Sequence, residues 1–399
     1  MTPAARLAAA ADILDTLGLT RPVEPQLKSW ARGNRYAGSK DRRAISDRVY
    51  TVLRRLRSAS LQGGGETGRL RVLGSLVAVD GLSVDTIEGL CAGGYGLAPL
   101  SDAERVALSC MPDWPSEGAR LDWPDWLMEQ AVEAFGEGVE RELDALRQRA
   151  PIDLRVNTLK ASREQAILAL GESGLDPLPL AAPTALRLPA GSAVAHSRAW
   201  REGLVELQDA GSQAIAAMVG AQPGETVLDY CAGAGGKTLA LAAAMQNQGR
   251  LFAYDVEPGR MADLPERAGR AGVRCLTRLQ KCDLAALEGG CDRVLVDAPC
   301  SGSGSWRRDP AGKWRLTPEG LSRLTALQDA ALDAALRYLR PGGVLVYATC
   351  SVLRVENEAR IDALLARHPF LTAGQSLHLH PARDECDGFF VGIVNLTAC

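Results

Sequence analysis

The sequence contains no run of about 18 consecutive apolar residues, so a membrane-spanning helix is not predicted. Its beginning is not typical of a signal peptide either, because Arg6, Asp12 and Asp15 interrupt the Ala- and Leu-rich stretch 1–19, which predicts an amphipathic helix. Hydrophobic residues make up 46% of the 399 residues, enough for the cores of two or three domains. These features predict a cytoplasmic globular protein and argue against a disordered chain.

The cysteines and histidines lack the spacings that disulfide frameworks and zinc sites require. The ten cysteines form no C-x-x-C motif and lie scattered through a long chain without a secretory signal. Only four histidines are present, and none has a cysteine at zinc-ligand spacing. His378 and His380 form an H-x-H pair, which we interpret as part of an exposed strand or loop. We therefore expect free thiols and no metal site.

A strong overall positive charge is also missing, because the formal net charge is −3. The charge is unevenly distributed, however. Residues 28–57 contain ten Lys or Arg and two acidic residues, Asp41 and Asp47, which gives this stretch a charge of +8. Trp30 and Tyr36 are interleaved with the basic residues. The pattern favours a surface that follows nucleic-acid phosphates, although an ordinary solvated helix face is the alternative.

The chain divides into three regions by pattern. Residues 1–140 predict a helical domain, because Ala, Leu and Arg recur at three- and four-residue spacing, and helices are also expected over 126–135 and 139–149. Residues 141–208 mix short strands with one helix and predict a small α/β subdomain. From 209 to 399, apolar strands alternate with Ala- and Leu-rich helices, which indicates a parallel sheet of βαβ units.

A glycine-rich turn follows the first of these strands. Residues 227–245 predict a strand, a turn and a helix, and such a turn exposes backbone N–H groups to a ligand. A nucleoside triphosphate loop is excluded, because Cys231 stands where its first glycine is needed. The dinucleotide pattern begins at Gly233 and Gly235 but meets Thr238 instead of its third glycine, which disfavours a nicotinamide cofactor.

The remaining candidate ligand of this turn is S-adenosylmethionine. Its ribose needs an acid at the end of the next strand, and Asp255 ends the strand-like stretch 251–255. A carboxylate there accepts hydrogen bonds from two vicinal hydroxyls. Asp283, after the third expected strand, would lie near the adenine. For both aspartates, capping of the following helix is the alternative.

Two cysteines follow buried strands in the same expected sheet. The apolar run 294–296 leads to Asp297-Ala298-Pro299-Cys300, and the run 344–347 leads to Thr349-Cys350-Ser351. Strand ends of this polarity face the ligand crevice of an open parallel sheet. A cysteine after the proline disfavours methylation of the adenine amine and fits methylation of a pyrimidine carbon. A thiolate that adds to carbon 6 of cytosine makes carbon 5 nucleophilic toward a sulfonium methyl, and a nearby carboxyl group assists.

Several of these stretches closely resemble the Nop2/Sun family of RNA cytosine-5 methyltransferases. The similar stretches are 297–315 (DAPCSGSGSWRRDPAGKWR), 339–358 (LRPGGVLVYATCSVLRVENE), 150–160 (APIDLRVNTLK), 207–213 (LQDAGSQ) and 387–390 (DGFF). The helical front resembles, more loosely, the NusB-like domain of the bacterial small-subunit rRNA enzymes of the Sun/Fmu type. The resemblance implies an α/β fold: a class I, Rossmann-like methyltransferase domain preceded by an all-helical NusB-like RNA-binding domain and a small α/β linking subdomain.

The resemblance also implies roles for individual residues. Cys350 is expected to be the nucleophile, Cys300 to assist release of the methylated base, and Asp297 to contact the cytosine near the cofactor. The turn that is expected to hold S-adenosylmethionine comprises Cys231, Ala232, Gly233, Ala234, Gly235, Gly236 and Lys237. Asp255 and Asp283 are expected at the ribose and adenine. The family commonly has proline where this chain has Ala234.

The implied substrate is 16S rRNA, and the protein is expected to act as a monomer, without binding DNA or a membrane. A tRNA cytosine-5 methyltransferase and a non-catalytic RNA-binding assembly factor remain alternatives. Because the target base must leave its stack, a loop or an unfolded RNA segment is the expected substrate. The basic and aromatic residues of 306–314 are candidates to hold the flipped base, and an ordinary packed loop is the alternative.

Overall fold

The computed structural model describes residues 1–91 and 95–397 and contains two compact units. The helical unit comprises Met1–Arg149 together with Trp306–Leu316, and the α/β unit comprises Ala150–Ser305 and the chain from Thr317 onward. Among the described residues, no helix combines the length and the hydropathy needed to cross a membrane. The division into three domains at residues 140 and 208 remains a prediction.

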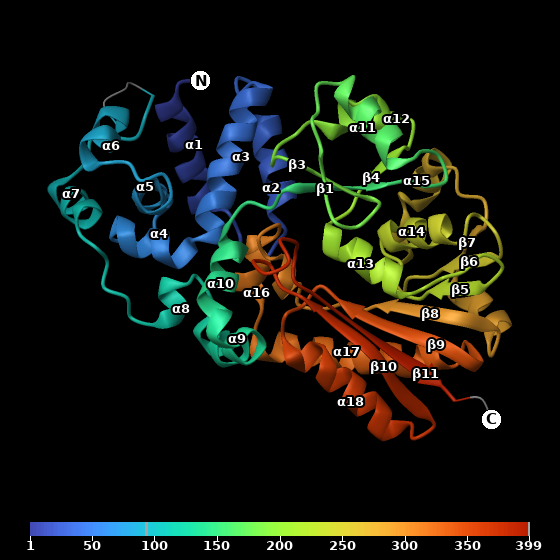
Figure 1. The fold of residues 1–399 in the computed structure, drawn as a ribbon. Coiled ribbons are helices and arrows are strands. Elements are labelled where there is room, and N and C mark those ends of the chain that lie inside the picture. The colour runs from blue at the N-terminus through green and yellow to red at the C-terminus, as the bar shows by residue number, and fades with distance from the viewer. Residues whose placement is uncertain (92–94, 398–399) are drawn as a thin grey trace. The chain divides into compact units, whose positions relative to one another are not determined.

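The helical unit confirms the helical pattern of the first region (Figure 1). On α3, the buried residues Ile45, Val49, Val52 and Leu53 recur at three- and four-residue spacing and face a single core. Its helices are α1 (Pro3–Thr16), α2 (Val23–Gly33), α3 (Ser39–Arg54), α4 (Leu56–Gly63), α5 (Gly68–Ala78), α6 (Val84–Cys91), α7 (Asp102–Ser109), α8 (Glu117–Arg120), α9 (Met128–Phe135), α10 (Val139–Arg147) and α16 (Pro310–Arg315). The last two helices of the first region lie where the sequence pattern predicts them.

The segment 306–316, which contains α16, packs inside the helical unit. Ala311 belongs to the helical core, and the rings of Trp306 and Trp123 lie 4.8 Å apart. Lys313 is 3% exposed, and its ammonium donates to the carbonyl of Arg54 over 3.1 Å. The structure therefore supports the packed-loop alternative for this segment, since most of the side chains proposed to hold a flipped base are occupied in the core.

The α/β unit begins with a small antiparallel sheet in the order β2-β3-β1-β4. Leu154 and Val156 of its central strand pack with Ala166 and Leu170 of the adjoining helix, which gives this sheet a hydrophobic core of its own. Its elements are β1 (Ile152–Val156), α11 (Arg163–Gly171), β2 (Leu178–Pro179), β3 (Ala185–Leu188), α12 (Arg198–Arg201) and β4 (Val205–Leu207).

The remainder of the α/β unit is built on a seven-stranded sheet in the order β10-β11-β9-β8-β5-β6-β7. Only β11 runs antiparallel to its two neighbours. The strand order reverses between β5 and β8, which places a ligand crevice at the carboxyl ends of these strands. The strands are β5 (Thr226–Asp229), β6 (Arg250–Ala253), β7 (Leu276–Arg278), β8 (Cys291–Asp297), β9 (Leu339–Thr349), β10 (Leu371–Leu379) and β11 (Phe389–Leu396).

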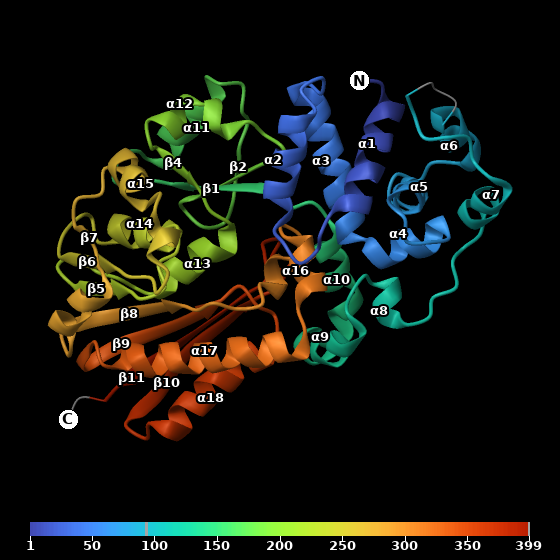
Figure 2. The same ribbon diagram turned by 180° about the vertical axis from the view of Figure 1, so that it is seen from behind.

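Helices cover both faces of this sheet. In Figures 1 and 2, α17 and α18 lie on one face, and α13, α14 and α15 lie on the other. The helices are α13 (Ala210–Met218), α14 (Gly236–Ala244), α15 (Leu264–Ala271), α17 (Pro318–Leu336) and α18 (Glu358–Arg367). The three-layer arrangement confirms the predicted Rossmann-like α/β class.

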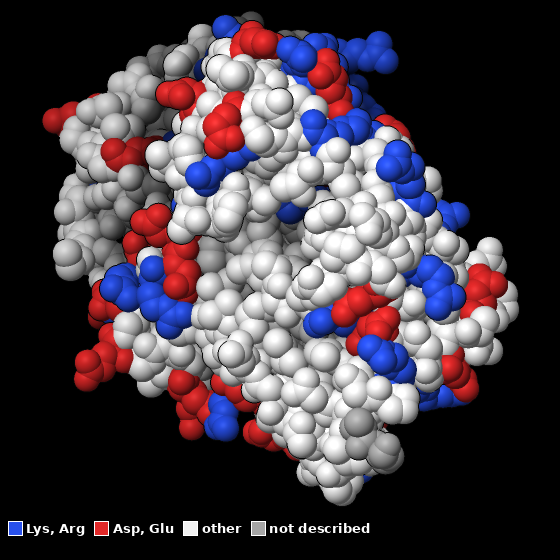
Figure 3. Space-filling view, turned by 45° about the vertical axis from the view of Figure 1, so that its right-hand side comes forward, with Lys and Arg blue, Asp and Glu red and all other residues white. Residues whose placement is uncertain are grey.

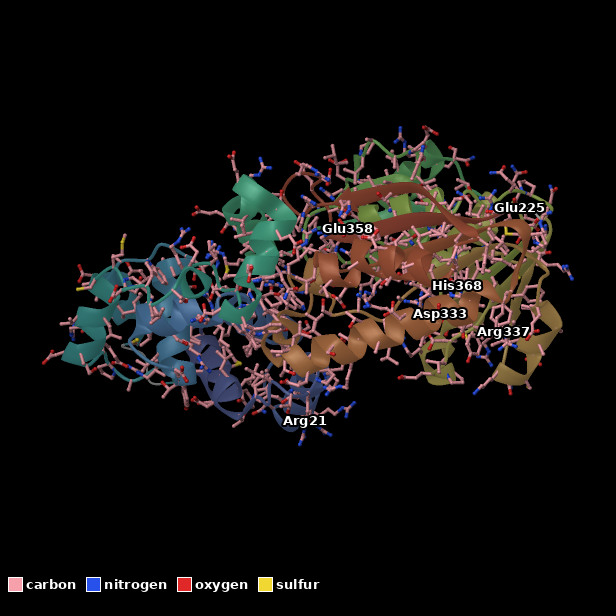
Figure 4. All side chains as sticks on the ribbon, turned by 90° about the horizontal axis from the view of Figure 1, so that it is seen from below. Arg21, Glu225, Asp333, Arg337, Glu358 and His368 are labelled. Carbon is pink, nitrogen blue, oxygen red and sulfur yellow. The ribbon has the colours of Figure 1, made fainter. Side chains whose placement is uncertain are left out.

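Ion pairs join the two helices on the first face. His368, just after α18, lies beside Asp333 of α17 with 2.9 Å between Nε2 and Oδ1 (Figure 4). Arg360 of α18 also pairs with Asp329 of α17 over 2.7 Å. These contacts hold α18 close to α17.

Candidate active site

The structure brings Cys300 and Cys350 together. Strands β8 and β9 are parallel neighbours with Asp297 opposite Ala348, so both strands end at the same edge of the sheet. Cys350 directly follows β9, and Cys300 follows β8 by three residues. The two Sγ atoms lie 3.4 Å apart, and both thiols are free and half-buried. The prediction that both cysteines lie at neighbouring strand ends is confirmed.

The surroundings of the two thiols shift their pKa values in opposite directions. The hydrogen bond from Cys300 lowers the pKa of Cys350, and the nearby Lys237 ammonium contributes in the same direction against burial and the Asp297 carboxylate. The same hydrogen bond raises the pKa of Cys300, and burial raises it further. Cys350 is therefore the sulfur that ionises first, and only a thiolate is a strong nucleophile.

Lys237 lies between the glycine-rich turn and the D-A-P-C motif. Its Nζ donates to Asp297 Oδ2 over 2.8 Å. Burial acts to lower the pKa of Lys237, but the Asp297 carboxylate outweighs this effect, so the pKa is raised and the side chain stays charged. Lys237 was expected only at the cofactor, and its pairing with Asp297 places it beside the reactive thiols as well.

The glycine-rich turn connects β5 to the start of α14, as predicted. Gly235 has a φ of +81°, and a Cβ there would lie 2.2 Å from Leu264 Cδ1, so this position requires glycine. Gly233, with a φ of +52°, donates its N–H to Asp255 Oδ2 over 2.9 Å. The turn thus presents backbone atoms at the carboxyl end of β5, and the Gly233 hydrogen bond connects the turn to Asp255, which follows β6.

The two aspartates expected at the cofactor differ in their surroundings. Asp255 is buried and holds both the turn and the chain after β6, because Glu257 donates to its Oδ1 over 2.9 Å. Asp283 is exposed, and its Oδ2 accepts from the N–H of Gln280 over 2.7 Å in a capping box. The structure therefore shows the helix-capping alternative at Asp283, whereas Asp255 binds the backbone of the glycine-rich turn and of the chain before the next helix.

Sequence reasoning missed Asp229, the last residue of β5. Thr238 donates to its Oδ2 over 2.6 Å, whereas its buried Oδ1 has no hydrogen-bond partner among the described residues. Burial is the main cause that raises the pKa of Asp229 to about 7. An orphaned acceptor at the carboxyl end of β5 fits a ligand that brings a hydrogen-bond donor. The signal in the sequence was an acid placed directly before the turn.

Backbone hydrogen bonds join the D-G-F-F motif to the two cysteine loops, which are the loops that follow β8 and β9 and carry Cys300 and Cys350. Gly304 donates its N–H to the carbonyl of Cys350 over 3.0 Å, and its own carbonyl accepts from the N–H of Gly388 over 2.8 Å. A Cβ at Gly304 would lie 2.0 Å from the Gly388 oxygen, so no larger residue fits there. The motifs around 300, 350 and 388 therefore form one tightly packed loop cluster.

The basic stretch 28–57 of the helical unit separates into two parts. Lys28, Arg32, Arg35, Lys40, Arg42 and Arg43 are exposed on and between α2 and α3. The later arginines serve the fold: Arg57 binds both oxygens of Asp125 at 2.9 Å, and Arg48 pairs with Asp80. Tyr36, 68% exposed, lies among the first group. The exposed group, residues 28–43, is the candidate phosphate-binding surface.

The face shown in Figure 3 carries no comparable field of one sign, because basic and acidic side chains alternate around a largely uncharged area. The mixed charge there agrees with the net charge of −3 for the whole chain.

The family comparisons agree with this geometry. Residues 216–395 match the family described as 16S rRNA methyltransferase RsmB/F, and residues 123–195 match the ferredoxin-like domain of RsmF/B-like methyltransferases. The second match spans the boundary between the two units, since it begins in the helical unit and continues into the small sheet. The similarity to a solved structure covers more of the chain than either family match does.

Individual relatives also indicate a small-subunit ribosomal RNA methyltransferase. A ribosomal RNA small subunit methyltransferase B from Citrobacter koseri is 33% identical over 306 residues, which cover 73% of this chain and 70% of that protein. The Xylella fastidiosa protein of the same name is 39% identical over 274 residues, covering 68% and 63%. The crystal structure of PH0851 superposes with a TM-score of 0.80 at 26% identity over 99% of both chains.

These similarities bear out the resemblance to the Sun/Fmu type and the expected cofactor, since the family uses S-adenosylmethionine as its methyl donor. The chain belongs to the RsmB/F family of small-subunit ribosomal RNA methyltransferases, and it is an S-adenosylmethionine-dependent RNA methyltransferase.

Proposed function

We propose that the protein methylates carbon 5 of a cytosine in 16S rRNA through a transient covalent bond between Cys350 and carbon 6 of the base. The observation that carries the proposal is the thiol pair, with 3.4 Å between the sulfurs and opposite pKa shifts. A methyl transfer to nitrogen or oxygen needs no thiol, whereas carbon 5 becomes nucleophilic only after addition at carbon 6.

We assign each cysteine a separate step of the reaction. The Cys350 thiolate forms the bond to carbon 6, and the displaced electron pair makes carbon 5 nucleophilic. S-adenosylmethionine supplies an electrophilic methyl group. A base then takes the proton from carbon 5, the freed electron pair restores the double bond between carbons 5 and 6, and the carbon–sulfur bond breaks so that Cys350 leaves as a thiolate. Cys300 is proposed to assist this release, because its thiol lies 3.4 Å from the Cys350 sulfur and can donate a hydrogen bond to that sulfur as it departs.

Asp297 and Lys237 are proposed to position the base. Asp297 is held by Lys237 over 2.8 Å, and we propose that it contacts the edge of the cytosine that carries N3 and the exocyclic amine. Lys237 stays charged and favours the Cys350 thiolate. Both roles depend on charge at a half-buried site, where Coulomb interactions are stronger than in water.

We propose that S-adenosylmethionine binds at the carboxyl ends of β5 and β6. We assign residues 231–237 to the backbone cradle around it and Asp255 to the ribose hydroxyls. The orphaned Oδ1 of Asp229 would accept from the amino group of the methionine part. For Asp283, the adenine contact remains part of the proposal, although its exposed capping position makes it the weakest member of the set.

The RNA is proposed to bind along residues 28–43 of the helical unit. Exposed basic side chains release counterions from the phosphates, and Tyr36 offers an aromatic face to an unpaired base. An rRNA substrate implies a cytoplasmic location, where we propose that the protein acts as a monomer. The intact set of Cys300, Cys350 and Asp297 argues against a purely structural role in ribosome assembly.

Bisulfite mapping of RNA from cells with and without the protein tests the proposal. We expect one or a few cytosines of 16S rRNA to lose their bisulfite resistance when the protein is absent, and the Cys350→Ala variant to fail to restore it. An unchanged map would contradict the proposal. A change confined to tRNA would support the tRNA alternative instead.

A further inference from the structure

Glu356 is a fully buried carboxylate whose side chain connects the two cysteine loops. Its Oε1 accepts from the N–H of Ser301 over 2.8 Å, and its Oε2 accepts from the hydroxyls of Ser301 and Ser351, both over 2.5 Å. Ser301 follows Cys300 directly, and Ser351 follows Cys350. One carboxylate therefore binds the residue next to each thiol.

A third element, α17, completes the set of contacts. Gln328 of this helix donates through Nε2 to Glu356 Oε1 over 3.0 Å and to the carbonyl of Pro299 over 2.9 Å. With Ser301 and Ser351, this gives Glu356 four donors, which is the full acceptor capacity of a carboxylate. A buried carboxylate is tolerated only when it is satisfied in this way.

The backbone of Glu356 is itself fixed. Tyr347 of β9 donates its hydroxyl to the Glu356 carbonyl over 2.6 Å. The next residue, Asn357, accepts from Thr349 Oγ1 over 2.6 Å and donates to the Ser351 carbonyl over 3.0 Å. Glu356 therefore cannot move without disturbing the end of β9, and its contacts restrict both cysteine loops at once.

We infer that Glu356 is a positioning residue that sets the separation of the Cys300 and Cys350 thiols. The inference deepens the proposed function and rests on it, because release of the base needs the two sulfurs within hydrogen-bonding distance. The charge of Glu356 adds to the causes that raise the pKa of Cys300, after the hydrogen bond to Cys350, burial and the Cys350 charge. Glu356 thus supports both the place and the protonated state of Cys300.

The separation of the thiols can be measured without any substrate. Diamide oxidises two adjacent thiols to a disulfide, and mass spectrometry of non-reduced peptides follows the Cys300–Cys350 bond. Since pairing requires specific geometry, we expect Glu356→Ala to form it at least about tenfold more slowly than the wild type. Glu356→Gln should stay close to the wild type, because the amide keeps Oε1 and the hydroxyls can accept from its NH₂ group.

Glu358→Gln is the matched control. Glu358 lies two residues further on and pairs with His378 over 3.1 Å rather than with the cysteine loops, so its disulfide rate should be unchanged. Circular dichroism and thermal unfolding establish which variants fold. If Glu356→Ala does not fold, the double variant Ser301→Ala with Ser351→Ala replaces it and should show the same slowing. Wild-type pairing rates in the folded variant would overturn the inference.

Turnover gives the second readout. We expect Glu356→Ala to lower kcat about a hundredfold, the cost of misplacing a reacting group by about 1 Å, with KM for RNA and for S-adenosylmethionine within about twofold. A merely destabilising change would instead lower the amount of active enzyme in step with unfolding, and Glu356→Gln would not rescue it. If the wild type does not methylate cytosine, the proposed function fails, whereas the disulfide rates still decide the role of Glu356.

Discussion

Lys237 Nζ and Asp297 Oδ2 lie 2.8 Å apart, and this ion pair joins the turn proposed to hold the cofactor to the motif that carries Cys300. Lys237 is the second residue of α14, which follows β5 and the glycine-rich turn, and Asp297 ends β8, so the pair joins the two sides of the point at which the sheet order reverses. A change in either residue therefore affects the charge around the Cys350 thiol.

Replacing Lys237 with Met should raise the pKa of Cys350. The cation that favours the thiolate disappears, and the Asp297 carboxylate, which opposes the thiolate, loses its partner. Alkylation of Cys350 by iodoacetamide, followed by mass spectrometry across a pH series, should therefore shift to higher pH. Lys281→Met, at an exposed position, serves as the control. An unshifted profile would remove Lys237 from the activation of Cys350.

The buried Lys313 should make the stability of the protein depend on pH. Burial is the main cause that lowers its pKa to about 7 in the folded protein. Between pH 7 and roughly 10.4, the ordinary lysine pKa, the unfolded chain binds more protons than the folded one, so stability rises with pH by up to about 1.4 kcal/mol per unit. Lys313→Met should remove this contribution.

The measurement is the difference in free energy of unfolding between Lys313→Met and the wild type at pH 6.5 and pH 8.5. The free energy of unfolding of Lys313→Met, relative to that of the wild type, should be higher at pH 6.5 than at pH 8.5, because at pH 6.5 the wild type must bury a charged lysine. The exposed Lys40→Met controls for changes in net charge. Equal differences at the two pH values would mean that Lys313 does not titrate near neutrality.

The two aspartates should differ in their effect on cofactor binding. Asp255→Asn should weaken the binding of S-adenosylhomocysteine about ten- to a hundredfold, since a hydrogen bond to a charged group contributes about 1.5 to 3 kcal/mol. Asp283→Asn should have a smaller effect, because this exposed carboxylate already caps its own turn. Isothermal titration calorimetry measures both, and the reverse order would show that Asp283 is the main contact.

The exposed basic surface should carry the salt dependence of RNA binding. The double variant Arg32→Ala with Arg42→Ala should bind single-stranded rRNA fragments more weakly, and the slope of log K against log salt should fall by about 0.7 for each phosphate that is no longer neutralised. Its thermal stability should not change. Arg57→Ala should instead destabilise the protein, because it breaks both bonds to Asp125. Fluorescence anisotropy between 50 and 200 mM salt, about the range over which such interactions respond, separates the two.

The sequence predicted the parts of the site that depend on strand ends. Continuous apolar runs, which are typical of strands buried on both faces, predicted β8 and β9. Because adjacent parallel strands end at the same edge of a sheet, Cys300 and Cys350 were expected to be neighbours. The glycine pattern located the turn after β5 in the same way. Local patterns were sufficient here, because Asp297, Cys300 and Cys350 each lie within three positions of a strand end.

The parts that escaped prediction depend on long-range packing. Glu356 contacts Ser301 across 55 positions, and no local pattern distinguishes it from the neighbouring Glu358. The basic and aromatic residues in 306–314 have the composition of an RNA-binding loop, yet Trp306, Arg307 and Lys313 are buried in the helical unit. Charge patterns do not reveal whether a side chain is solvated or buried, and only the tertiary structure decides it.

The central claim is that Cys350 attacks the base and Cys300 assists its release. Incubating each variant with rRNA and S-adenosylmethionine, and resolving protein–RNA adducts on denaturing gels, tests it most directly. Cys300→Ala should accumulate a covalent adduct, because release is impaired, and Cys350→Ala should form none and lose turnover. An adduct in Cys350→Ala, or normal turnover without the Cys350 sulfur, would contradict the account.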